Sequence, residues 1–235
     1  MLLSALILLQ PAVALTPAVA ATDAARVEAL NNPPPVVRWA GRQTVLGTRN
    51  LPVLGDLETR TDLWVLARVD REGDRWVIHQ TTCAVRVADV MGVSVDFPAH
   101  AVERLPPVAF TLTRDADGIF QAPPWSSGWD AKDYDRDGWG GLTLTVSAPM
   151  CSGRLAVTSH AETTATVLRA NDTALELDLA VRVGQQVLET DGWCLRYADK
   201  ETDDKFTGKV RYEPLSPTAT CKDVVALPPV LPPTP

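Results

Sequence analysis

Residues 61–87 read TDLWVLARVDREGDRWVIHQTTCAVRV, and this stretch decides the fold class. Apolar residues occupy every second position along residues 61–69, which is the period of a half-buried β-strand. The segment DREGD at residues 70–74 is rich in turn formers, and the alternation resumes along residues 75–87. The stretch therefore predicts an antiparallel β-hairpin.

The same two-residue period recurs along most of the chain, and no long stretch has a convincing helical period. We expect an all-β, antiparallel meander of about eight to ten strands, which would most simply remove its exposed edges by closing into a barrel. A two-sheet β-sandwich is the alternative. Near the start, Gly41, Gly47 and Pro52 interrupt the pattern, so we expect loop and only short strand there. Other expected strands cover residues 93–97, 108–112, 142–148, 163–169, 175–181 and 206–212.

The 235-residue chain is expected to fold as a single β domain over residues 36–222. Residues 1–20 have the features of a signal peptide, because a short apolar run precedes the small-residue segment Ala-Val-Ala. Residues 21–35 are expected to form a flexible lead-in, and residues 223–235 a proline-rich disordered tail. No other stretch reaches membrane-spanning length. The protein is therefore expected to be secreted or periplasmic, without an integral membrane span.

The charge balance argues against some partners. The formal net charge is -7 and the sequence pI is about 5.0. Phosphate backbones repel such a surface, and the sequence has no cluster of Lys and Arg that would form a local exception. We therefore expect no nucleic-acid partner.

Four cysteines, Cys83, Cys151, Cys194 and Cys221, indicate two disulfides in an exported chain. Three pairings are possible. We favour Cys194 with Cys221, which would join the last strands, and Cys83 with Cys151. The wide spacing and the lack of a C-x-x-C motif argue against a zinc or redox site.

The densest chemical pattern is WSSGWDAKDYDRDGWGGLTLTV at residues 125–146. Three alternate carboxylates precede a glycine that permits a sharp bend, and hard calcium ions prefer such sets of oxygen ligands. A solvated acidic turn is the simpler alternative, because Asp and Gly are common turn residues without any ion. The candidate ligands for a structural calcium ion are Asp133, Asp135, Asp137, the carbonyl of Trp139, and Asp130 as an additional carboxylate.

In its D-x-D-x-D-G spacing this loop resembles the calcium loops of EF-hands and dockerins. The resemblance is limited to the loop, because Leu144 stands where an EF-hand carries its bidentate Glu, and a strand rather than a helix is expected to follow. It excludes an EF-hand domain but leaves a calcium loop between β-strands open. The loop and the strand after it also resemble those of secreted bacterial β-rich proteins to which no function is assigned.

Tryptophans surround the acidic loop. Trp125, Trp129 and Trp139 could form a surface on which a sugar ring stacks, or they could plug one end of the barrel, and we favour the plug. The remaining tryptophans, Trp39, Trp64, Trp76 and Trp193, are expected to be core residues.

No recognised catalytic motif occurs, so enzymatic activity is uncertain and less expected than a binding role. The leading hypothesis is a structural or binding module with a calcium-ordered loop. The second is a carrier of a small apolar ligand, similar in kind to lipocalins. The segment Trp39-Ala40-Gly41 faintly resembles the N-terminal tryptophan motif of that family. The third is a hydrolase that uses calcium structurally. Possible partners are a carbohydrate, a small apolar ligand or another protein.

Overall fold

The computed structural model describes residues 37–51, 55–197 and 201–230. It confirms the all-β, antiparallel class, because most of the described chain is in strands and the helices among the described residues are three short ones. The expected signal peptide and lead-in lie outside the described residues. The strands are β1 (Arg38–Leu51), β2 (Gly55–Glu72), β3 (Arg75–Val87), β4 (Ser94–Asp96), β5 (Val108–Arg114), β6 (Phe120–Trp129), β7 (Leu142–Ala148), β8 (Cys151–Ala170), β9 (Leu175–Asp191) and β10 (Glu201–Leu215). The helices are α2 (Ala99–Val102), the 3-10 helix η1 (Leu195–Tyr197) and α3 (Cys221–Val225).

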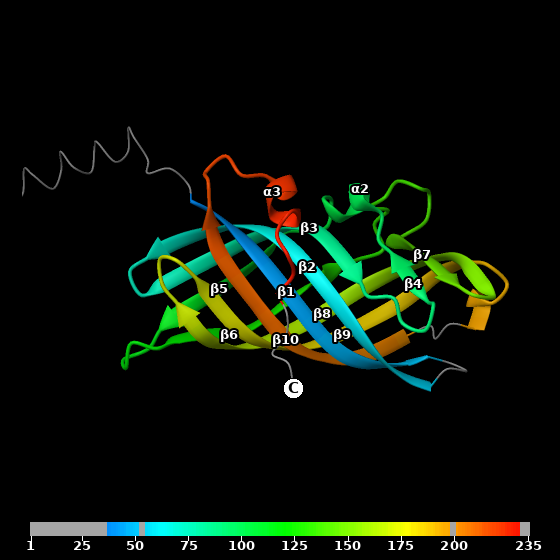
Figure 1. Cartoon of the computed structure of the whole chain (residues 1–235), viewed down its shortest axis with the longest axis horizontal. Helices are drawn as coiled ribbons and strands as arrows, with labels where there is room; N and C mark the ends of the chain where they lie inside the picture. The colour runs from blue at the N-terminus through cyan, green and yellow to red at the C-terminus, as the bar shows by residue number, and fades with distance from the viewer. Residues whose placement is uncertain (1–36, 52–54, 198–200, 231–235) are drawn as a thin grey trace, which may run out of the picture. The chain divides into compact units, whose positions relative to one another are not determined.

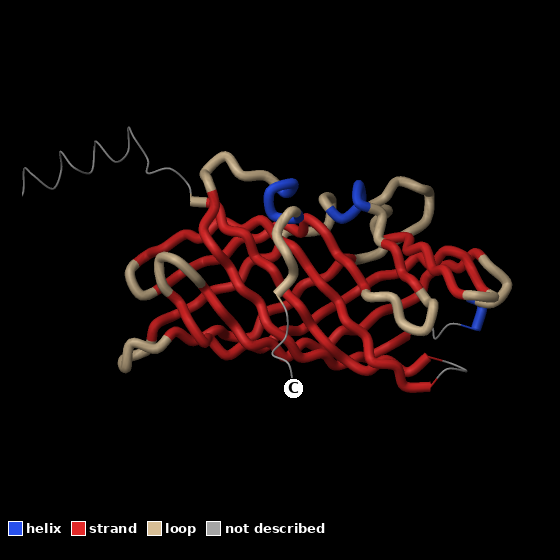
Figure 2. The backbone as a smooth tube through the Cα atoms, viewed as in Figure 1, coloured by secondary structure: helices blue, strands red, loops and turns tan. Residues whose placement is uncertain are grey.

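Eight strands form a closed antiparallel ring (Figures 1 and 2). Its order is β1-β2-β3-β5-β6-β8-β9-β10, and β10 pairs back with β1. Each ring strand therefore pairs with the next ring strand along the chain, which is the expected meander. The remaining strands extend the sheet outside the ring, where β7 pairs with the first part of β8 and β4 pairs with β7. The ring is compatible with both expected architectures, a barrel and a two-sheet sandwich.

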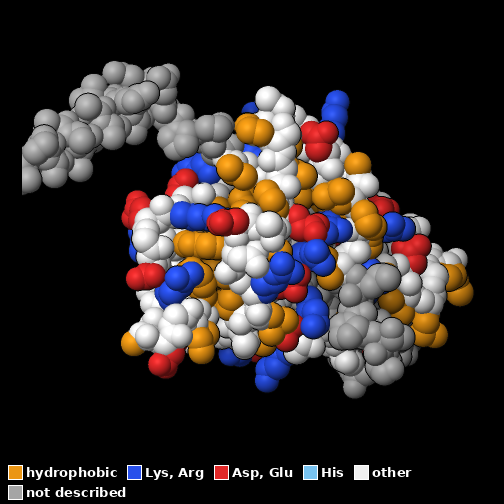
Figure 3. All heavy atoms as spheres, turned by 60° about the vertical axis from the view of Figure 1, so that its left-hand side comes forward, with side chains coloured by type: hydrophobic (Ala, Val, Ile, Leu, Met, Phe, Trp, Pro, Cys, Tyr) orange, Lys and Arg blue, Asp and Glu red, His pale blue; other side chains and the backbone are white. Residues whose placement is uncertain are grey.

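Alternating side chains place the main core inside the ring. Leu175, Leu177 and Leu179 of β9 are at most 4% exposed, whereas Glu176 and Asp178 between them face outward into ion pairs. Trp39 and Trp76 belong to the same core, as expected. Figure 3 shows acidic and basic side chains interspersed on one outer face of the molecule.

The other two tryptophans have different outcomes: Trp64 is a core residue, as expected, whereas Trp193 is not. Trp64 is buried on the opposite face of β2, in a separate cluster with Cys83 and Val224. The prediction for Trp193 was wrong, because its side chain is 68% exposed. Trp193 lies beyond the end of β9, in the turn that leads to η1, where the alternation that buries β9 side chains no longer applies.

The expectation of loop and short strand near the start was also wrong, because β1 is a continuous strand of 14 residues. Its glycines make room for aromatic rings of β10. A Cβ atom on Gly41 would lie 2.4 Å from Cε1 of Tyr212, and one on Gly47 would lie 2.4 Å from Cδ1 of Phe206. These glycines mark close cross-strand packing rather than breaks in the strand.

The C-terminal segment covers the outer face of β1 to β3. Val224 of α3 is fully buried, and Trp64 Nε1 donates a hydrogen bond of 3.0 Å to the carbonyl of Leu227. The expected disordered tail therefore does not begin at residue 223, because Val224 and Leu227 pack against the sheet. The proline-rich composition did not predict these contacts. Residues 231–235 lie outside the described chain.

Two disulfides are present, but the favoured pairing was wrong. Cys83 of β3 bonds to Cys221 of α3, and Cys151 bonds to Cys194. The packing of α3 beside β3 determines the first bond, which spans 138 residues, and the pairing of β8 with β9 brings the second pair together. In the described part of the chain, no helix has the length and apolar character to cross a membrane.

Candidate metal centre

The acidic loop is an excursion between two strands that share one edge of β8. Trp129, at the end of β6, pairs with Ser159, and Leu142, at the start of β7, pairs with Val157. The chain thus leaves the edge of β8 beside Ser159 and returns to the same edge beside Val157. Backbone hydrogen bonds from Tyr134 to Gly141 and from Gly141 to Lys132 hold the two arms of the loop together.

A buried tyrosine anchors this loop in the second hydrophobic cluster of the protein. Tyr134 is 7% exposed and packs in a cluster with Leu105 and Leu142. Its hydroxyl donates a hydrogen bond of 3.0 Å to Oδ1 of Asp130. Burial, together with that hydrogen bond to a carboxylate, raises the pKa of Tyr134. On the α2 side, His100 Nε2 lies 3.2 Å from the carbonyl oxygen of Asp135.

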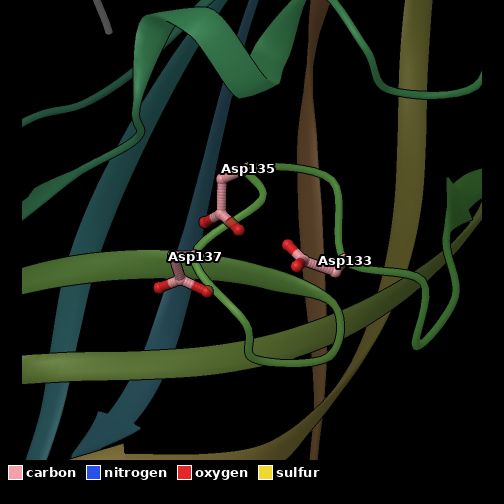
Figure 4. A group of neighbouring side chains, drawn as sticks. All are labelled: Asp133, Asp135 and Asp137. Atoms are coloured by element: carbon pink, nitrogen blue, oxygen red, sulfur yellow. The ribbon is translucent and has the colours of Figure 1, made fainter.

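The three alternate carboxylates converge. One oxygen from each of Asp133, Asp135 and Asp137 lies within 4.8 Å of the others, and Figure 4 shows the three side chains gathered in the loop. Gly138, with φ of 93°, makes the sharp bend that the sequence predicted, and its N–H donates to Asp133. The loop therefore positions its backbone around the carboxylates.

Asp135 is the unusual member of this group. It is 9% exposed, and although its Oδ2 accepts a 2.8 Å hydrogen bond from the N–H of Thr143, its Oδ1 is buried without a hydrogen-bond partner among the described residues. Burial raises the pKa of Asp135, and the neighbouring carboxylates of Asp137 and Asp133 reinforce that shift. A buried charged oxygen without a partner is costly, so this position favours a positive ligand.

Asp133 and Asp137 are better satisfied. Although desolvation opposes the shift, the N–H groups of Gly138 and Arg136 lower the pKa of Asp133. Asp137 accepts a hydrogen bond from the N–H of Trp139, and its Oδ2 lies 3.6 Å from the guanidinium of Arg154. Both ends of the cluster therefore have hydrogen-bond partners, whereas the buried middle has one oxygen without a partner among the described residues.

The side chains of the remaining candidate site residues lie outside this group of three carboxylates. Asp130 accepts hydrogen bonds from Lys132 and Tyr134 and lies outside the group of converging carboxylates. Of the three tryptophans, Trp125 stacks on Phe110 in the main core, Trp129 packs on the second cluster, and Trp139 lies under the guanidinium of Arg154. They occupy three different environments.

Sequence reasoning missed the contacts that bury Asp135. Thr143 and His100 reach it through a strand and a helix that the spacing of the aspartates does not describe. Comparison with models of protein families, with curated proteins and with solved structures finds no match for this chain. The candidate function therefore depends on the geometry of the loop.

Proposed function

We propose that the loop at residues 130–141 binds one divalent cation, with calcium as the natural ion, and that the ion stabilises an exported β protein. The observation that carries this proposal is the buried, unpartnered Oδ1 of Asp135 in a group of three converging carboxylates. A cation bound there would supply the missing partner and would offset the repulsion between the carboxylates.

The donor set favours calcium over softer metals. The three side chains offer only hard carboxylate oxygens, and the loop has no His or Cys within it. Calcium tolerates irregular coordination with six to eight oxygens, to which the carbonyl of Trp139 and water would contribute. A site with three carboxylates suits the weak affinities, about 10⁻⁴ to 10⁻³ M, of extracellular calcium modules.

The site is proposed to be structural rather than catalytic, because it lies in the loop that joins β6 to β7 and its central ligand is buried against Thr143. Two disulfides are typical of proteins that fold in an oxidising compartment. Secretion or a periplasmic location, where calcium is plentiful, is part of the same proposal.

Thermal unfolding of the oxidised protein in 10 mM calcium and in chelator tests the proposal. With a Kd of about 10⁻⁴ M, calcium would add about 2.7 kcal/mol and raise Tm by about 5–11 °C. Asp135→Asn should reduce that rise strongly, because its neutral amide oxygen attracts a divalent cation more weakly than a carboxylate. Asp117→Asn, in the acidic turn at residues 115–118, is the matched control and should keep the full calcium shift.

The same experiment has an informative second arm. In chelator, Asp135→Asn should be at least as stable as the wild type, because it removes a buried charge that repels Asp133 and Asp137. The wild type should therefore be the more stable of the two proteins in calcium but not in chelator. A wild type whose Tm is the same in both solutions would overturn the proposal.

A further inference from the structure

The ring interior is filled at one end and hollow at the other. Trp39, Trp76 and Phe120 pack together where β1, β3 and β6 have one set of ends. Further along the same strands the interior encloses a cavity of about 250 Å³. Between the two parts, the hydroxyl of Tyr212 on β10 donates a 2.6 Å hydrogen bond to Oε1 of Gln80 on β3.

The chemistry of the cavity wall limits what the cavity can bind. Most of the lining is apolar, including Val45, Leu63 and Phe206, and none of the lining residues that the structure describes is Asp, Glu, Lys, Arg or His. Burying an unpaired charge in such a space would be costly, so the wall selects against ions. The cavity is slightly smaller than the usual range of about 300–1,000 Å³ for ligand pockets, which favours a small occupant.

About a third of the described lining residues carry a hydroxyl or amide group, and two of the glutamines among them have hydrogen-bonding capacity to spare. The amide of Gln43 has no hydrogen-bond partner among the described residues, and Gln80 is bonded only through Oε1. An occupant that can exchange a hydrogen bond with these amides would satisfy groups that the protein leaves available. The lining thus fits a mainly apolar molecule that carries one neutral polar group.

A cleft at the surface adjoins the cavity. Strands β5 and β6 pair only at Thr113 with Gln121 and at Arg114 with Phe120, and they then separate. Residues 123 and 124 of β6 are both proline, which has no N–H to donate, and the register between β6 and β8 shifts at the same point. The surface cleft shares Val108, Trp129 and Ser159, among other residues, with the wall of the cavity.

From these observations we infer a second binding site, independent of the proposed cation loop. The half-hollow ring binds a small, uncharged, mainly apolar molecule with one hydrogen-bonding group, and the molecule enters between β5 and β6. The strand pattern alone predicted a carrier of a small apolar ligand, and the cavity adds the position of the site and the chemical class of the ligand.

Titration with N-phenyl-1-naphthylamine tests the inference, because this probe is neutral, mainly apolar and small, and carries a single N–H. The full-length, oxidised protein should enhance its fluorescence saturably, with one site per chain. Decan-1-ol should displace the probe at least about tenfold more effectively than decanoate at pH 8, where decanoate is charged. Equal displacement by the two compounds would overturn the selection against charge.

Matched variants locate the site. Ala161→Phe and Val45→Phe add bulk to two different walls of the cavity and should weaken probe binding by at least about tenfold. Thr164→Phe and Leu46→Phe add the same ring on the outer face of the same strands and should leave binding unchanged.

Circular dichroism and thermal unfolding identify which of these variants are folded, and two independent wall variants are available in case one misfolds. Unchanged binding by a folded Ala161→Phe or Val45→Phe protein would place the probe elsewhere and contradict the inference. The absence of saturable binding by the wild type would do the same.

Discussion

Two turns of the described chain have the sequence Asp-x-Asp-Gly with a glycine of positive φ, and they differ in how their carboxylates are satisfied. In the turn at residues 115–118, Asp115 is exposed, and both of its oxygens accept hydrogen bonds, from the N–H groups of Asp117 and Ile119 and from the side chain of Gln121. In the loop at residues 130–141, Asp135 is buried and one of its oxygens has no hydrogen-bond partner in the described structure.

The difference shows that acidic composition alone does not define a site. Hydrogen bonds from Ile119 and then Gln121 lower the pKa of Asp115, so its charge is already stabilised by the protein. Burial raises the pKa of Asp135, so its charge is not. Both turns have Asp-x-Asp followed closely by glycine, but only the second creates a need for an external positive charge.

The largest effect is expected from the anchor that only the second turn has. Tyr134→Ala should lower the free energy of unfolding by about 3–5 kcal/mol, because it empties a buried aromatic position. Ile119→Ala, at the end of the first turn, should change it by less than about 0.5 kcal/mol, because Ile119 is 56% exposed. Urea unfolding in chelator measures both. Similar losses in the two variants would contradict the claim that the loop at residues 130–141 is anchored.

A medium effect is expected from the two glycines. Gly138 and Gly118 have φ of 93° and 80°, and nothing lies within 4 Å of a Cβ atom added to either. Gly138→Ala and Gly118→Ala should each cost about 1–2 kcal/mol in chelator, because the left-handed conformation disfavours a side chain.

The two glycine variants should differ in their affinity for calcium. Gly138→Ala should also weaken calcium binding, because the strained bend would shift the N–H that holds Asp133, whereas Gly118→Ala should bind calcium like the wild type. Isothermal titration calorimetry measures the two affinities. Equal affinities would show that the bend at Gly138 does not shape the site.

Much of the fold follows from local patterns. The alternation of Leu175, Leu177 and Leu179 with charged residues identifies the core face of β9 without any knowledge of its neighbours. The pattern fails where a residue serves a distant partner. Gly41 breaks the alternation because the ring of Tyr212 lies against it, and Cys83 bonds to Cys221 because α3 folds back over β3. Neither contact can be predicted from the sequence around Gly41 or Cys83.

The candidate site divides in the same way. The spacing of Asp133, Asp135 and Asp137 predicts that their carboxylates converge, because alternate positions of a tight loop face inward. The spacing cannot predict that Asp135 is the buried member, since its burial depends on the neighbouring elements that close over it. It also placed Asp130 among the candidate ligands, whereas the hydroxyl of Tyr134 engages that carboxylate.

The smallest effect is expected at Asp115, whose two carboxylate oxygens both accept hydrogen bonds. The pKa of Asp115 is lowered in the folded protein, so its charge stabilises the fold at neutral pH, and this contribution is lost as the pH falls through the folded pKa. The wild type should therefore be slightly more stable than Asp115→Asn at pH 7, and the difference should shrink below about pH 4. Asp117→Asn, whose side chain has no hydrogen-bond partner in the described chain, should show no such trend in urea unfolding at pH 7 and pH 3. A difference in stability that grows on acidification would mean that the hydrogen bonds to Asp115 do not stabilise its charge. The proposed contrast between a stabilised Asp115 and an unstabilised Asp135 would then be wrong.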